Sequence, residues 1–159
     1  MHAIPWYVAL LISVPQTLLI IEFGFRLFNI HLKVKDILLI SVIIAVFCYF
    51  FRSFHISYAV NTLLLITLLS LCTFFICNID IRYCFIAVIL GVMIYGALES
   101  LLLPLIIQLL RLSFDELIVN PKFNLIAFVP ILIIAVALLW YIIKKDIVLY
   151  DLYKEENEI

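Results

Sequence analysis

Two carboxylates lie inside apolar stretches of this sequence, and their chemistry needs explaining first. Glu22 and Glu99 each stand among long runs of Leu, Ile, Val and Phe. A charged group at the centre of a bilayer costs about 2.5–3.5 kcal/mol on insertion scales, so an intramembrane carboxylate is by default a candidate functional residue.

The depths of the two carboxylates decide whether they form a pair. At 1.5 Å per helical residue, Glu22 lies roughly 24 Å from Trp6, and Glu99 lies roughly 24 Å from Tyr83 on a helix of the opposite direction. We therefore expect Glu22 in the inner third of the membrane and Glu99 in the outer third. This separation argues against a diacid, protease-like site.

Glu22 has a partner nearby in the sequence. Arg26 follows it by four residues, which places both side chains on one helix face in the favourable acid-first order. We expect this ion pair to anchor the inner end of the first helix.

Glu99 has two interpretations. It is structural if it pairs with Arg52 or donates a hydrogen bond to Asn61, and it is a ligand or cation contact if it lines an outward-open cavity. Gln16, beside Pro15, adds a third polar feature, because proline frees a backbone carbonyl one turn earlier. That site is either a binding notch or a kink satisfied by neighbouring helices.

Small residues follow one another along the segment that contains Glu99. Gly91, Gly96, Ala97 and Ser100 predict a face suited to close helix packing. We therefore expect this fourth helix at the centre of the bundle.

Residue patterns for catalysis or metal binding are missing from the sequence. It contains no HExxH, GxSxG, phosphate-binding or dinucleotide motif, and its serines and threonines have no base beside them. We predict no enzyme activity, no catalytic residues, no metal and no cofactor. The histidines fall at segment ends and the cysteines behave as small apolar residues: His2, His31, His55, Cys48, Cys72, Cys77 and Cys84.

The elements that must position these residues are membrane-spanning helices. The 159 residues are 68% hydrophobic and 13% charged, against about 45–50% and about 25% in soluble domains. We predict an all-α, polytopic membrane helix bundle over residues 1–145 and a short cytoplasmic tail over 146–159. The five spans run approximately over Ile4–Phe28, Asp36–Phe51, Ile56–Ile79, Tyr83–Leu110 and Phe123–Ile143.

Two spans have uncertain ends. The second is short and begins earlier if Lys33 and Lys35 extend their ammonium groups to the interface. Pro104 predicts a kink in the fourth span, after which Leu105–Ile118 either spans the membrane or forms an interfacial piece.

Basic residues predict the orientation. With the N-terminus outside, seven Lys and Arg residues fall in inner segments and three, Arg52, Arg111 and Lys122, fall in outer segments. This distribution favours an N-out, C-in protein of the plasma membrane. The net charge of −1 and the scattered basic residues predict no nucleic-acid partner.

Several short features occur together along nearly the whole chain: Trp6-Tyr7, Pro15-Gln16, Glu22, Lys33 to Asp36, Gly96-Ala97-Leu98-Glu99 and Asn120-Pro121. This pattern resembles the N-terminal multi-helix membrane sensor region of Gram-positive histidine kinases with GHKL-type ATPase domains, including peptide-sensing kinases. The resemblance implies a sensor region followed by a phospho-accepting histidine and an ATP-binding domain. No histidine follows His55 here, so we expect no kinase activity from these residues.

The resulting functional expectation is a small bacterial membrane sensor or regulatory protein. It would bind a hydrophobic ligand or peptide near Glu99 and act through a signalling partner or a homodimer in the bilayer. The tail from Lys144 would extend the last helix by about three turns as a docking stub, or would simply be a solvated helix end. The alternatives are a membrane transport component and a structural subunit of a membrane complex.

Overall fold

The computed structural model describes residues 6–52, 58–110 and 121–149, and these residues form helices and connecting turns without any strand. The five helices are long and apolar enough to cross a membrane, so the chain is an all-α, multi-pass membrane protein. Their bounds are α1 Trp6–Leu27, α2 Val34–Arg52, α3 Tyr58–Cys77, α4 Ile81–Leu110 and α6 Pro121–Lys144. These bounds confirm the five predicted spans, and α2 begins before Asp36.

Hydroxyl groups within the spans donate to their own helix. Thr67 Oγ1 donates to the Leu63 carbonyl at 2.8 Å, and Thr73 Oγ1 donates to the Leu69 carbonyl at 2.7 Å. Ser100 Oγ donates likewise to the Gly96 carbonyl at 2.6 Å. Such bonds let hydroxyls enter an apolar medium without an unsatisfied donor.

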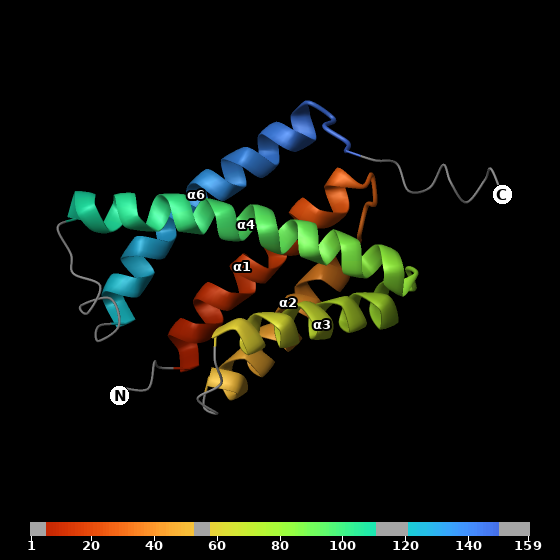
Figure 1. Cartoon of the computed structure of the whole chain (residues 1–159), viewed down its shortest axis with the longest axis horizontal. Coiled ribbons are helices and arrows are strands. Elements are labelled where there is room, and N and C mark those ends of the chain that lie inside the picture. Colours follow the sequence, from red (N-terminus) through yellow and green to blue (C-terminus); the bar gives the residue numbers. More distant parts are fainter. Residues whose placement is uncertain (1–5, 53–57, 111–120, 150–159) are drawn as a thin grey trace.

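The helix α1 is the central element. It contacts α2, α4 and α6, while α3 packs against α2 and α4 (Figure 1). Half of the α1 span is buried inside the protein (50%), compared with 22% of the α4 span. The prediction that the fourth helix is the centre is therefore wrong, because α1 and α4 each pack mainly against three helices but α4 leaves more of its surface exposed.

Two glycines bring α1 and α4 into backbone contact. A Cβ atom on Gly24 would overlap the Ala87 carbonyl, and a Cβ atom on Gly91 would overlap the Ile20 carbonyl. The helices therefore cross where neither has a side chain, as in close-packed membrane helices.

The predicted small face of α4 does not act as one surface. Gly91 is buried against α1, whereas Ala97 and Ser100 are exposed. That prediction is corrected, because these residues point in different directions around the helix.

Three helices end in left-handed residues at the same end of the bundle. Asn29, Asn78 and Asp146 follow α1, α3 and α6 with φ of 60°, 53° and 46°. After α1, the Ile30 amide donates to the Phe25 carbonyl at 2.9 Å, which completes a Schellman motif.

The same type of cap terminates α6. The Ile147 amide donates to the Ile142 carbonyl at 3.2 Å, and the chain then turns so that the Leu149 amide donates to the Leu27 carbonyl at 2.8 Å. Of the two alternatives for the tail, a helical extension is therefore wrong over residues 145–149, because Asp146 leaves the helical conformation. Residues 150–159 lie outside the described part of the chain.

The long helix α4 continues through Pro104 as far as Leu110. Its 30 residues correspond to about 45 Å, more than the roughly 30 Å of a hydrocarbon core. Residues 105–110 continue α4 after Pro104 as part of the same helix, and 111–118 lie outside the described residues.

Candidate functional site

A cavity of about 260 Å³ lies between all five helices. It occupies the half of the bundle that contains the beginnings of α1, α3 and α6 and the ends of α2 and α4. The lining residues comprise Ile12, Ser13, Gln16, Thr17, Ile20, Cys48, Asn61, Thr62, Leu65, Val92, Tyr95, Gly96, Glu99, Leu103, Asn124, Ala127, Phe128 and Ile131.

Three residues singled out by the sequence meet in this cavity. Gln16 comes from α1, Asn61 from α3 and Glu99 from α4, and all three line it. Arg52, the fourth member of the predicted polar group, is the last residue of α2, and its side chain lies outside the described part.

Side-chain amides enter the cavity from three helices. Gln16, Asn61 and Asn124 all line it, and none of the three forms a hydrogen bond with another residue that the structure describes. An amide that enters an apolar bundle needs such bonds, so these groups can hold water or a ligand. Asn124 was missed in the sequence analysis, although an asparagine inside an apolar span was a usable signal.

The α4 wall of the cavity is shaped by a glycine. A Cβ atom on Gly96 would meet no atom within 4 Å. Unlike Gly24 and Gly91, this glycine leaves open space instead of permitting a helix contact. Tyr95 and Glu99, one turn apart, flank it along the lining.

The position of the cavity follows from the register of α1 against α4. Ile20 lies against Gly91, and Gly24 lies against Ala87. Because α1 and α4 are antiparallel, the same register places Glu99 of α4 near the level of Ile12 of α1. Prolines occur in α1, α4 and α6, at Pro15, Pro104 and Pro130, and each frees a carbonyl one turn earlier. The helices thus touch at the glycines, and the cavity lies to one side of that contact.

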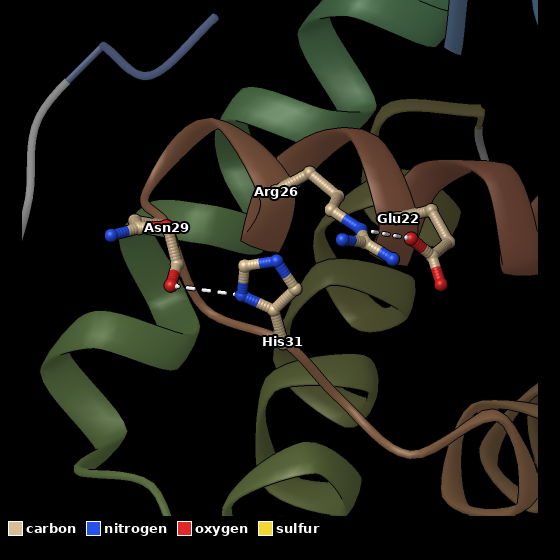
Figure 2. A network of polar contacts seen from close by, with 4 residues as sticks. All are labelled: Glu22, Arg26, Asn29 and His31. Carbon is tan, nitrogen blue, oxygen red and sulfur yellow. Dashed lines mark hydrogen bonds and ion pairs between the residues drawn. The ribbon is translucent and has the colours of Figure 1, made fainter. Parts of the chain in front are cut away.

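The predicted anchor pair lies on α1 outside this cavity. Arg26 Nε donates to Glu22 Oε2 at 3.1 Å (Figure 2). By the register above, the levels of Glu22 and Glu99 differ by ten residues of α1, or roughly 15 Å. The two carboxylates are therefore separate, as their predicted depths require.

The loop after α1 contains His31, the histidine in the described part of the chain. His31 Nδ1 lies 3.3 Å from the Asn29 carbonyl oxygen, and its side chain is exposed (Figure 2). Within residues 6–52, 58–110 and 121–149, no group of three or more His, Cys, Asp and Glu residues is placed to hold a metal ion. The candidate functional site among these residues is the cavity lined by all five helices.

Comparison with protein-family models, with curated proteins and with solved structures gives no match. The resemblance to a histidine-kinase sensor region therefore stays a prediction.

Proposed function

We propose that this protein is a small sensor or regulatory protein of the plasma membrane. It binds a small ligand in the cavity around Glu99 and passes the bound state to a partner protein or a second copy. The observation that carries this proposal is a cavity lined by all five helices, in which amides from α1, α3 and α6 meet a carboxylate from α4.

The composition of the cavity supports binding. Small-molecule sites typically combine apolar walls with a few convergent polar groups and enclose about 300–1,000 Å³. The volume of about 260 Å³ is slightly below that range, which favours a small ligand. Ile20, Val92 and Ile131 supply apolar wall, while Gln16 and Glu99 supply polar groups.

The helix α6 provides a route from the cavity to the opposite end. It lines the cavity with Asn124 and Phe128, and the segment after its end is bonded to α1 through Leu149 and Leu27. A ligand that binds more tightly when α6 is in one position shifts the equilibrium between the two positions of α6 toward that one. The size of the shift is set by the difference between the two binding free energies. Its effect then reaches the residues that follow Lys144.

Charge supports an N-out, C-in orientation. Basic residues gather at the end opposite the cavity, and Lys144 Nζ lies 4.8 Å from the centre of the Trp140 ring. Aromatic and basic residues together are typical of a membrane interface, and basic loops are retained inside. The cavity then lies in the outer half of the membrane.

Cysteine labelling tests whether water and ligands enter the cavity. Cys48 lines it, so we keep Cys48 and replace Cys72, Cys77 and Cys84 with Ala. A membrane-impermeant methanethiosulfonate should modify Cys48 from the N-terminal side. Gly96→Leu should slow this reaction by filling the cavity, whereas Ala97→Leu, at an exposed position of α4, should not.

Purification tests the regulatory role. The full chain, extracted in mild detergent and analysed by mass spectrometry, should retain a partner protein or a second copy, and Gly96→Leu should alter that association. A monomer without partners would contradict the proposal. Solute uptake by liposomes that contain the chain alone would instead indicate a transport component.

A further inference from the structure

The polar groups of the cavity are rich in hydrogen-bond acceptors. Glu99 offers a carboxylate, and Gln16, Asn61 and Asn124 each offer a carbonyl oxygen. Ser13, Thr17 and Thr62 add hydroxyl oxygens. Amides and hydroxyls also donate, but the charged member of the described lining is an acid.

Glu99 has acceptor capacity beyond any single partner. An ionised carboxylate has about four lone-pair sites on its two oxygens. Glu99 can therefore accept a hydrogen bond from a ligand while it interacts with another residue. In its ionised form, which a bound cation stabilises, Glu99 favours a cation and disfavours an anion.

The size and walls of the cavity favour an organic cation over a bare metal ion. A volume of about 260 Å³ exceeds what one ion fills, and the described residues offer no cluster of three or more acidic, His or Cys side chains. Ile20, Val92 and Phe128 form apolar wall around the polar groups. A ligand that matches both parts has a charged head and a compact apolar body.

We infer that the cavity binds a small primary amine in its ammonium form. The head donates to the Glu99 carboxylate and to amide carbonyls of the lining, and the apolar body lies along Ile20, Val92 and Phe128. The open space at Gly96 limits the size of the ligand's apolar part. This inference rests on the proposed ligand-binding function and names the class of ligand.

Three compounds of similar shape test the charge. Isobutylamine, isobutanol and isobutyrate are added separately to the full chain that retains Cys48, and the rate of Cys48 modification is measured. Because a hydrogen bond to a charged group is stronger than one between neutral groups, isobutylamine should protect Cys48 at roughly tenfold lower concentration than isobutanol. Isobutyrate should give the weakest protection.

Matched variants assign the effect to the cavity. Glu99→Gln, which keeps the shape of the side chain, should remove the advantage of the amine over the alcohol. Gly96→Leu should abolish protection by all three compounds, and Ala97→Leu should leave it unchanged. The midpoint of thermal unfolding shows whether each variant is folded, and the rate of Cys48 modification without any added compound is the reference for its protection.

Separate outcomes overturn the inference and the proposed function. Equal protection by amine and carboxylate, or an amine preference that persists in Glu99→Gln, refutes the amine class while cavity binding stands. If Cys48 reacts but none of the compounds protects it, the amine class is refuted and only the accessibility of the cavity is established. If Cys48 does not react, the accessible cavity itself is refuted, and the thermal midpoint with each compound still tests the amine preference.

Discussion

Gly24 and Gly91 lie opposite each other where α1 crosses α4, and each lies against the backbone of the other helix. Cβ atoms at these positions would overlap the carbonyls of Ala87 and Ile20. Because the contact is reciprocal, both glycines are needed for the helices to approach this closely.

We predict that Gly24→Ala and Gly91→Ala each destabilise the protein by about 1–3 kcal/mol, the usual cost of overpacking. Gly96→Ala is the matched control, since its new methyl group meets no atom within 4 Å. Unfolding in mixed micelles with increasing SDS measures the three changes. Equal effects at Gly91 and Gly96 would contradict a backbone contact at the crossing.

The ion pair of α1 should contribute modestly to stability. Arg26 and Glu22 are 3.1 Å apart, with side chains 29% and 15% exposed, and i,i+4 pairs contribute about 0.3–0.5 kcal/mol. A double-mutant cycle with Glu22→Gln and Arg26→Gln should give a coupling free energy of about that size. A coupling several times larger would show that further groups share the charge.

Ser41 should be more stable as alanine. Its Oγ is buried and has no hydrogen-bond partner among the described residues, and a buried unsatisfied group costs about 1–3 kcal/mol. We expect Ser41→Ala to raise the free energy of unfolding by about 1 kcal/mol. Ser70→Ala is the control, because Ser70 Oγ donates to the Ile66 carbonyl at 2.8 Å. A loss of stability in Ser41→Ala would indicate a partner for that hydroxyl.

The segment after α6 should be held by one amide. The Leu149 amide donates to the Leu27 carbonyl at 2.8 Å, so hydrogen–deuterium exchange at Leu149 should be slower than at Val148. Leu149→Pro removes the donor and should speed exchange at Ile147 and Val148, whereas Leu149→Ala keeps it. Identical exchange in the two variants would mean that this bond does not hold the segment.

The sequence predicted the helices well because length and hydrophobicity are local properties. Spans such as Tyr83–Leu110 were predicted from the length of each apolar stretch alone. The observed helix ends differ from the predicted ends by one turn or less. The start of α2 at Val34 agrees with the expectation that the second span begins before Asp36.

The arrangement of the helices was harder to predict. Gly91 was predicted to lie at a packing surface, but Gly24, its counterpart on α1, was not. A single glycine in a sequence does not indicate which other helix packs against it. The same limit led to α4 being placed at the centre instead of α1.

The site was predicted in part. Gln16, Asn61 and Glu99 were identified because polar groups in apolar spans are conspicuous, and the structure places them around one cavity. Asn124 was missed. The turn at Asp146 was also missed, because its left-handed conformation depends on the cap that forms with Ile142 and Ile143.

Different glycines govern the strength of the fold and the size of the cavity. A substitution at Gly96 reduces the cavity without touching the crossing of α1 and α4. The ligand preference that we propose for the cavity can therefore change by substitution at Gly96 without a compensating change at the helix crossing. The residue that limits the cavity, Gly96, is thus separate from the residues that hold α1 against α4, Gly24 and Gly91.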